Sequence, residues 1–571
     1  MPTLCYTFDL TRPHTHLVGV ALTLPAHGAL HTDLVLPAWL PGAYKIFDNA
    51  RNIRGFAAVS PDGEAVRVER VDWQTWRVYD GGEGGVVVRY DVYCNKPEIH
   101  QGQLDAEHGF LNPGVLAVFP KGHQEDWPVT LELVVPEGWR VATGLKATGP
   151  TSFKALHYEQ LIDCPLQCGD FAHAHFTQDG VRYEVVYEGA TPWDPALLIP
   201  PLRRIVTAAS DLWGRPPLDR YVFMYLETEA DFLNGLEHAN STIITGPVTD
   251  PQRLDGLLTI TTHEFFHLWN VKRLRPVGFG PFDYTREAHT TALWVAEGFT
   301  EYYTDVLMRW AGLHGADQFL ASVAGYIEQL HAMPGRRNMS LEEASWTTWH
   351  FGDDRWNGAL NYYVKGYLLG VALDLTLRER SDGEVSLDDV MRGMWEAYGA
   401  PGINYRPEDV CRLAERLLGD SLEAFWAHHL RGRDDWDWDA LLRPAGLMLL
   451  ERNPRPALQA DGRPAEGGVR LESVLAGGAA QEAGLQRGDV LVAIGGLRAT
   501  TQLLHGLGEQ VEPGDTVEVH YFRRDVLRTT LVTMARQVSY ALVPSPGATA
   551  SQNALRAAWL AGMPAQSGVR A

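Results

Sequence analysis

Hydrophobic and polar residues alternate along much of the first 180 residues. Segments such as 86–93 (VVVRYDVY) and 129–136 (VTLELVVP) run apolar or place an apolar side chain at every second position, and β-branched residues are frequent in them. This period of two is typical of strands with one buried face. Turn signals such as PDG at 61–63 separate the segments. The pattern predicts a β-sandwich-like domain over residues 1–180.

Beyond that region the apolar residues recur three and four positions apart. Segments 257–273, 290–310, 362–380 and 406–419 show this spacing, and several begin at Ser, Thr or Pro and end at Gly. Both features are typical of amphipathic helices with capped ends. The pattern therefore predicts an α-rich domain over residues 181–450.

Strand patterns return after a linker rich in Pro and Arg, ERNPRPALQADGRP at 451–464. Segments 468–474, 516–524 and 528–535 are again apolar and β-branched. They predict a small β-rich domain over 456–540, followed by a tail, 541–571, that contains a short amphipathic segment. The chain as a whole is predicted to be a multidomain α+β protein.

Composition narrows the choice of partners. The 571 residues carry a formal net charge of −22, which disfavours nucleic acid and anionic membrane surfaces as partners. Five cysteines in a chain of this length do not form a disulfide framework. The N-terminus lacks a basic segment followed by an apolar run, and no apolar run of about 18 residues occurs. We therefore expect a cytoplasmic protein without a membrane span; its oligomeric state is left open.

Two histidines four residues apart, His263 and His267, lie in one of the predicted helices. Four helical steps of about 100° bring both rings to one face, where they can bind zinc. Glu264 would lie beside the metal and take a proton from a zinc-bound water. The alternative is a core helix that contains two histidines by chance.

A third zinc ligand is available about 30 residues further on. Glu297 lies in another predicted amphipathic helix, in the segment AEGF. Glu301 is four residues later on the same face, where it would hydrogen-bond a ligand imidazole, unless it is a solvated helix carboxylate. We expect one Zn²⁺ per chain, bound by His263, His267 and Glu297.

Two further segments carry candidate chemistry. Tyr363, in the sequence YYVKG, could donate a hydrogen bond to the oxyanion of a tetrahedral intermediate, or serve only in packing. Gly235, Glu237 and His238 follow the predicted strand 221–227. A carboxylate beside a strand edge can bind the α-ammonium of a peptide substrate; the alternative is a solvated turn glutamate.

Together these motifs resemble the gluzincin metallopeptidases, which share a thermolysin-like catalytic domain. The order GLEH at 235–238, HEFFH at 263–267, AEGF at 296–299 and Y-x-KG at 363–366 is similar to that of their aminopeptidase branches. His238, in place of an asparagine, and the segment PAWLPGAYKI at 37–46 resemble the glycyl aminopeptidase family.

The resemblance implies a role for each residue. His263, His267 and Glu297 would be the zinc ligands and Glu264 the general base and later acid. Tyr363 would be the oxyanion donor, and Glu237 the anchor for the free N-terminus. It also implies a preference for N-terminal glycine and alanine.

The C-terminal β-rich domain resembles bacterial PDZ domains. The resemblance rests on GGAAQEAGLQRGDVL at 477–491 and on the glycine turn after Ile494. A carboxylate-binding loop would then lie at 466–468, where Glu466 would repel a peptide carboxylate. Peptide capture and a role in packing or assembly are both open.

The sequence therefore predicts a zinc-dependent aminopeptidase that acts on peptides with a free N-terminus. One alternative is a zinc endopeptidase whose PDZ-like domain engages longer peptides. A second is a peptide-binding scaffold without catalysis. Neither a phosphate-binding P-loop nor a dinucleotide-binding glycine motif occurs, so nucleotide chemistry has no support.

Overall fold

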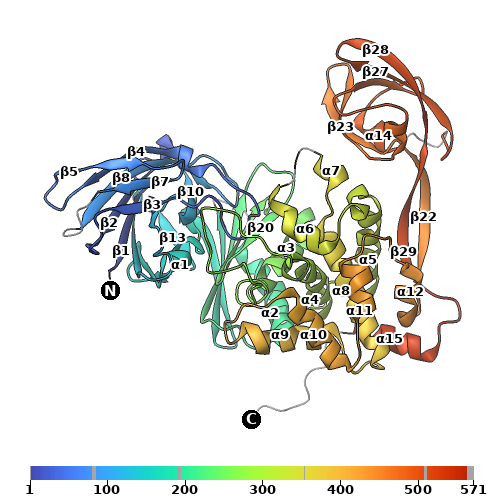
Figure 1. Cartoon of the computed structure of the whole chain (residues 1–571), viewed down its shortest axis with the longest axis horizontal. Coiled ribbons are helices and arrows are strands. Elements are labelled where there is room, and N and C mark those ends of the chain that lie inside the picture. The colour runs from blue at the N-terminus through green and yellow to red at the C-terminus, as the bar shows by residue number, and fades with distance from the viewer. Residues whose placement is uncertain are drawn as a thin grey trace. The chain divides into compact units, whose positions relative to one another are not determined.

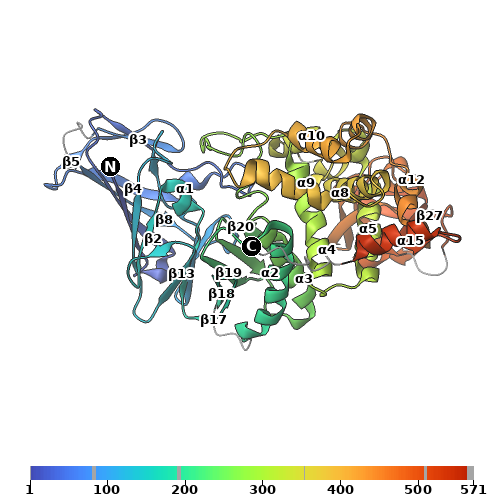
Figure 2. The same cartoon turned by 90° about the horizontal axis from the view of Figure 1, so that it is seen from below.

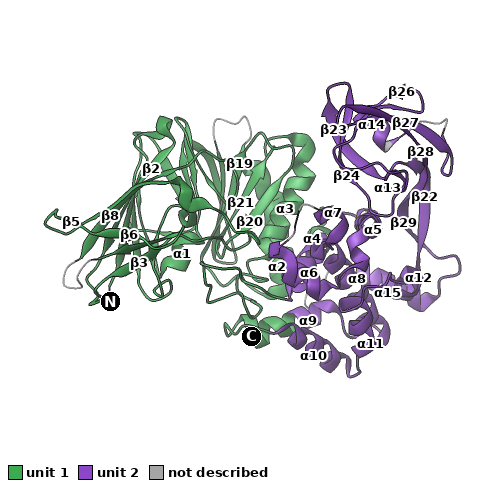
Figure 3. Cartoon of the chain, turned by 45° about the horizontal axis from the view of Figure 1, so that its top comes forward, with its two compact units in different colours: residues 1–290, 306–313, 392–405 green, residues 291–305, 314–391, 406–571 purple. Residues whose placement is uncertain are grey.

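The computed structural model describes residues 2–79, 85–188, 194–350, 352, 354–506 and 511–561. Its chain forms two compact units, coloured separately in Figure 3. The first comprises residues 1–290, 306–313 and 392–405, and the second comprises 291–305, 314–391 and 406–571. Residues 562–571 of the predicted tail lie outside the described residues.

The N-terminal part of the first unit is built from β-sheets. Within the described ranges, the largest sheet runs in the order β14 (Lys146–Ala147), β15 (Ser152–Ala155), β12 (Val129–Val134), β1 (Leu4–Asp9), β2 (Leu17–Leu24), β8 (Val86–Tyr93), β4 (Ile53–Val59) and β5 (Ala65–Val66). A second sheet runs β13 (Arg140–Thr143), β16 (Leu166–Gly169), β10 (His108–Leu111) and β9 (Gly102–Leu104), and a third runs β11 (Phe119–Pro120), β3 (Thr32–Val35), β7 (Thr75–Val78) and β6 (Val68–Arg70).

The alternating sequence pattern explains these strands. Along β12 the residues are alternately buried and exposed, and Val129, Leu131 and Leu133 all face the core. In β2 and β8 every second residue is likewise buried. Burial of one face of each strand is what a period of two requires. The prediction of a β-rich N-terminal domain is confirmed.

A mixed sheet in the same unit carries the next elements. It runs in the order β17 (Phe171–Gln178), β18 (Val181–Glu188), β19 (Arg220–Glu227), β21 (Ser241–Gly246) and β20 (Asn234–Glu237). Figure 2 shows helices α2 (Ile199–Trp213) and α3 (Leu254–Phe266) beside this sheet. Strand β20 is at the edge and pairs antiparallel with β21, so that Glu237 is opposite Thr242.

Helix α3 is fixed to the sheet by aromatic contacts. The ring of Phe265 packs edge-on against Tyr221, with 5.1 Å between the ring centroids, and lies 5.7 Å from Phe223. Both partners come from β19, and all three side chains are fully buried. Aromatic pairs at such distances stabilise a particular helix position beyond the area they bury. The face of α3 opposite to Phe265 is therefore the face that can carry chemistry.

Helices make up most of the second unit. They are η6 (Trp294–Phe299), α4 (Thr300–Trp310, whose last five residues belong to the first unit), α5 (Ala316–His331), α6 (Leu341–Thr347), α7 (Arg355–Gly358), α8 (Tyr362–Arg380), α9 (Leu387–Met394, which ends in the first unit), α10 (Pro407–Leu418), α11 (Glu423–Phe425) and α12 (Trp438–Leu442). The helices predicted at 362–380 and 406–419 are confirmed. The predicted helix at 290–310 instead begins with a π-helix, η6, and continues as α4.

The π-helical turn lies where two helices approach closely. A Cβ atom added to Gly298 of η6 would be 2.5 Å from the Cα of Gly366 in α8. The peptide oxygen of Tyr362 would be 3.1 Å away. Only glycine at both positions allows this approach, which brings the first turn of α8 against the segment that carries Glu297. Local π-helical turns are frequent at functional sites.

A small β-sheet and a long ribbon complete the second unit. The ribbon pairs β22 (Leu447–Ala457) with β29 (Ala535–Pro544), as Figure 1 shows. The sheet, in the described residues, runs β23 (Ala460–Ala465), β24 (Gly468–Val474), β25 (Val490–Ile494), β27 (Thr516–Arg523) and β28 (Val526–Thr533), with β26 (Leu497–Arg498) beside β25 and short helices α13 (Ala479–Glu482) and α14 (Thr501–His505).

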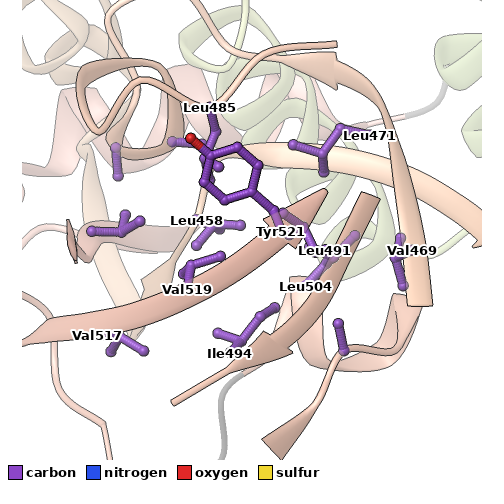
Figure 4. Packing of buried hydrophobic residues seen from close by; sticks show 14 of the residues in the cluster. Leu458, Val469, Leu471, Leu485, Leu491, Ile494, Leu504, Val517, Val519 and Tyr521 are labelled. Carbon is purple, nitrogen blue, oxygen red and sulfur yellow. The ribbon is translucent and has the colours of Figure 1, made fainter. Parts of the chain in front are cut away.

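The small sheet has a hydrophobic core of its own. Figure 4 shows Leu458, Leu485, Leu491, Val519 and Tyr521 packed together in it, and each is at most 5 % exposed. A separate core is what an independent domain needs. Residues 466 and 467, where a carboxylate-binding loop was expected, form the turn of the β23–β24 hairpin.

The C-terminal helix packs onto the helices of the second unit. Helix α15 (Ala550–Leu560) places the buried Trp559 so that its indole N–H donates to the Tyr302 hydroxyl at 3.0 Å. That hydroxyl in turn donates to Asp374 at 2.8 Å. Residues of the predicted tail therefore stabilise α4 and α8. None of the helices in the described ranges combines the length and apolarity that crossing a membrane requires.

The contact between η6 and α8 can be tested by adding one methyl group. Gly298→Ala should destabilise the protein by about 1–3 kcal/mol because the backbone of α8 must move. The apparent melting temperature should fall by roughly 2–4 °C for each kcal/mol. Gly325→Ala in α5, whose added Cβ meets no atom within 4 Å, is the control and should be neutral or stabilising. Equal melting temperatures for the two variants would contradict this packing.

Candidate active site

Two imidazoles from α3 face the same point. The Nε2 atoms of His263 and His267 are 3.1 Å apart, and the two rings are nearly perpendicular. His267 is the residue after the last turn of α3, and its N–H donates to the carbonyl of His263 at 3.3 Å. The helix thus ends one residue earlier than the motif, but the helical spacing that aligns the rings is kept.

The histidine geometry fits a bound metal ion. Nδ1 of His267 is 2.7 Å from the carbonyl oxygen of Asn270, so Nδ1 carries the proton and Nε2 presents its lone pair. A second ring nitrogen held by a carbonyl is the usual arrangement in metal-binding histidines. Two ring nitrogens that approach to 3.1 Å need a proton or a cation between them.

Glu297 supplies a carboxylate from η6. The residue is buried, with 3 % of its surface exposed. The helix that continues from η6, α4, contacts α3 directly, because the Thr262 hydroxyl lies 3.3 Å from Sδ of Met308. One potential ligand atom from each of His263, His267 and Glu297 lies within 4.8 Å of the other two. Two imidazoles and a carboxylate are a donor set typical of catalytic zinc.

Glu264 is buried beside the histidines, and the edge strand β20 limits its position. A Cβ added to Gly235 would lie 2.7 Å from both Cγ and Cδ of Glu264. The absence of a side chain at Gly235 therefore lets the Glu264 carboxyl group lie against the strand. Glu237, Glu264 and His267 form a second cluster whose potential ligand atoms are all within 4.8 Å of one another.

The Glu237 carboxylate is enclosed by a loop of the N-terminal β domain. Gly42 lies in this loop with φ of +85°, and a Cβ there would be 2.8 Å from Oε2 of Glu237. Glu237 itself is 6 % exposed. The sequence reading did not identify Gly42 as a site residue, although it lies in the segment PAWLPGAYKI. Its role depends on a contact between residues almost 200 positions apart.

His238 is buried next to Glu237 and faces a different partner. Its Nδ1 is 3.3 Å from Oδ1 of Asp163, which also accepts a hydrogen bond from Lys272 at 2.6 Å. Burial would raise the pKa of Asp163, but the nearby Lys272 and His238 hold that pKa well below its ordinary value. Asp163 and Lys272 were not recognised from the sequence, because no local pattern joins them.

Tyr363 and Glu301 are both in the second unit. The ring of Tyr363 stacks on Tyr362 with 4.9 Å between centroids, in the first turn of α8 that packs on η6. Burial and the charge of Glu297 raise the pKa of Tyr362, so this turn lies close to the Glu297 carboxylate. Glu301 accepts a hydrogen bond from the hydroxyl of Tyr326. Its predicted bond to a ligand imidazole stays a prediction.

Comparison with known proteins identifies the fold. Residues 5–170 match the family model of the Peptidase M61 N-terminal domain, and residues 256–369 match that of the M61 glycyl aminopeptidase. The crystal structure of an aminopeptidase N family protein from Idiomarina loihiensis superimposes with a TM-score of 0.90 at 28% identity, over 98% of this chain and 100% of that chain.

Over these two ranges the chain carries the N-terminal and glycyl aminopeptidase domains of the Peptidase M61 family. The descriptions of the matched domain and of this relative are both those of an aminopeptidase. An M1 zinc metallopeptidase from Deinococcus radiodurans shares the fold, with a TM-score of 0.51 at 16% identity over 76% of this chain and 94% of that chain. No curated protein matches the chain.

Some of the candidate residues lie inside the M61 matches and others lie between them. His263, Glu264, His267, Glu297 and Tyr363 all lie within 256–369. Gly235 and Glu237 of β20, and His238 directly after it, lie between the two matched ranges. The small C-terminal sheet follows both matches, so its PDZ-like character stays a prediction.

Gly235 offers a test of how Glu264 is positioned. Gly235→Ala should force the Glu264 carboxyl group away from β20 and lower kcat by roughly 100-fold, the cost of a displacement of about 1 Å. Steady-state kinetics on a glycyl substrate measures the loss. Gly256→Ala, in the first turn of α3, is the control because its Cβ would meet only Leu233 at 3.6 Å. If both variants keep the wild-type kcat, β20 does not position Glu264.

Proposed function

We propose that this protein removes small residues, glycine and alanine, from the free N-terminus of peptides by using one zinc ion per chain. The observation that carries the proposal is the pair of overlapping clusters, His263 with His267 and Glu297, and His267 with Glu264 and Glu237. One cluster suits a metal and the other adds two carboxylates beside it. The family's description as a glycyl aminopeptidase supports the preference for glycine.

His263, His267 and Glu297 would hold the zinc ion. When bound, zinc acts as a Lewis acid that polarises the scissile carbonyl and lowers the pKa of water. The donor set is two neutral imidazoles and one carboxylate, which leaves a tetrahedral ion room for one further ligand. The carbonyl of Asn270 keeps the proton of His267 on Nδ1 and so keeps Nε2 available.

Glu264 would act as the general base and then as the acid. It takes a proton from the attacking water and returns it to the amine that leaves when the peptide bond breaks. Glu264 is buried, with 5 % of its surface exposed, so bulk water does not compete for the proton. The Tyr363 hydroxyl would donate to the oxyanion that develops on the carbonyl oxygen, because α8 begins beside Glu297.

Glu237 would bind the substrate's α-ammonium group. A buried carboxylate forms strong charge-assisted hydrogen bonds with an ammonium, and Glu237 is within a few ångströms of Glu264 and His267. When the α-ammonium of a peptide is bound to Glu237, only the first peptide bond can lie beside Glu264 and His267. This geometry favours an aminopeptidase over an endopeptidase.

Glu264→Gln tests the general base. The amide cannot accept the proton from water, so kcat should fall by about 100- to 10,000-fold. The three metal ligands are unchanged, so the purified variant should still contain about one zinc per chain when assayed by mass spectrometry. Hydrolysis of glycyl substrates at the wild-type rate, with zinc retained, would contradict the role of Glu264.

Glu237→Gln tests the anchor for the free N-terminus. Loss of a charge-assisted hydrogen bond of about 1.5–3 kcal/mol should lower kcat/KM for free peptides by roughly 10- to 100-fold. Wild-type enzyme should spare the same peptides once they are N-acetylated, and product masses report each cut. Glu229→Gln, an exposed neighbour, is the control and should behave as wild type. Cleavage of acetylated peptides at internal bonds would favour an endopeptidase instead.

A further inference from the structure

A carboxylate of the N-terminal β domain reaches the catalytic elements. Asp163 follows helix α1 (Tyr158–Ile162), and its Oδ1 accepts a hydrogen bond from Nζ of Lys272 at 2.6 Å. Its Oδ2 accepts the backbone N–H of Ala239 at 2.9 Å. Lys272 is only 7 % exposed, so this is a largely buried ion pair.

The carboxylate of Asp163 is charged where it lies. Burial would raise its pKa, but Lys272 and His238 together hold the pKa well below the ordinary value. Buried ion pairs stabilise a fold little compared with an apolar pair of the same volume. A gain in stability therefore does not by itself explain this pair. The groups that the pair holds in place do.

The carbonyl of Ala239 is held by a second cation. Nη1 of Arg273 donates to the oxygen of Ala239 at 2.9 Å and to that of Leu268 at 2.8 Å. Both backbone polar groups of Ala239 are thus bound by charged side chains, its N–H by Asp163 and its carbonyl by Arg273. Charge-assisted bonds of this kind are roughly twice as strong as neutral ones.

Asp163, Lys272 and Arg273 thus form a clamp around Ala239. The clamp joins the segment that carries Glu237 to the segment that carries His267. Ala239 lies two residues after Glu237, in the turn that is closed by the bond from His238 N–H to Ser241 O at 3.0 Å. Lys272 and Arg273 come from the turn that follows His267. The same turn includes Asn270, whose carbonyl orients the His267 ring. The clamp therefore ties the strand end that carries Glu237 to the turn that orients His267.

We propose that Asp163, Lys272 and Arg273 are positioning residues that set the distance between Glu237 and His267. This inference rests on the proposed function, in which Glu237 binds the α-ammonium and His267 binds zinc. The distance fixes which peptide bond reaches the reacting position, so the clamp determines that cleavage follows the first residue. The N-terminal β domain, through Asp163, thereby takes part in choosing the bond.

The test removes Asp163 together with Lys272, so that neither member of the ion pair is left buried without its partner. The double variant Asp163→Leu with Lys272→Met replaces the pair by apolar side chains and frees Ala239 from its carboxylate. The Ala239 N–H and Nδ1 of His238 lose their acceptor, so the melting temperature should fall by a few degrees, while the zinc content should stay close to that of wild type. Its kcat/KM for free glycyl peptides should fall by roughly 10- to 100-fold. The preference for free over N-acetylated peptides should fall as well.

A matched control removes an ion pair elsewhere in the same domain. Asp33 and Arg77 form a half-buried pair at 2.7 Å on β3 and β7. Asp33→Leu with Arg77→Met should leave both the rate and the preference for free N-termini unchanged. As a second arm, Lys272→Arg keeps the charge and should keep this preference, whereas Lys272→Met alone should lose it.

Three outcomes would overturn the inference. Wild-type kcat/KM and preference in the double variant would show that the clamp does not position Glu237. A loss of activity that accompanies a loss of zinc would show a structural role only. Equal losses in Lys272→Arg and Lys272→Met would exclude the charge as the cause. Failure of the proposed function would show in a different measurement: the wild-type enzyme would then cleave acetylated and free peptides alike.

Discussion

The approach of two imidazole nitrogens at the end of α3 is the constraint on which the rest of the site depends. Nε2 of His263 and Nε2 of His267 lie 3.1 Å apart, and the two rings are nearly perpendicular. The carbonyl of Asn270 holds the His267 ring, while Phe265 fixes the opposite face of the helix to the sheet. The packing of the helix thus decides how the face that carries the two histidines is presented.

The other site residues are arranged around this pair by close backbone contacts. Gly235 and Gly42 provide space for the carboxylates of Glu264 and Glu237, and Gly298 allows α8 to approach η6. At each of these positions a methyl group would meet an atom at less than van der Waals distance. Glycine at these positions therefore allows neighbouring segments to approach closely. As a result, the carboxylates of Glu237 and Glu264 lie near the two histidines.

Much of the fold and site followed from local sequence pattern. The period of two predicted β8 and β12, and the helical spacing predicted α8 with both of its ends. The four-residue spacing of His263 and His267 predicted that their rings would share a face, which the structure confirms. These features depend on neighbours within one element, so the sequence pattern contains them.

The remaining features depend on contacts between distant parts of the chain. An apolar pattern cannot separate a π-helix from an α-helix, and η6 forms where Gly298 meets Gly366, 68 residues later in the numbering. Asp163 and Lys272 are 109 positions apart and belong to no motif. Trp559 looked like part of a tail, yet its indole bonds to Tyr302 in the interior. Tertiary packing alone reveals such residues.

Anomalous X-ray scattering from crystals of the freshly purified protein, recorded on both sides of the zinc absorption edge, tests the central claim most directly. The account predicts one zinc peak per chain, bonded to Nε2 of His263, Nε2 of His267 and the carboxylate of Glu297, at about 2.0–2.2 Å from each ligand atom. A peak held by other residues, or no zinc in material that hydrolyses glycyl peptides, would contradict it.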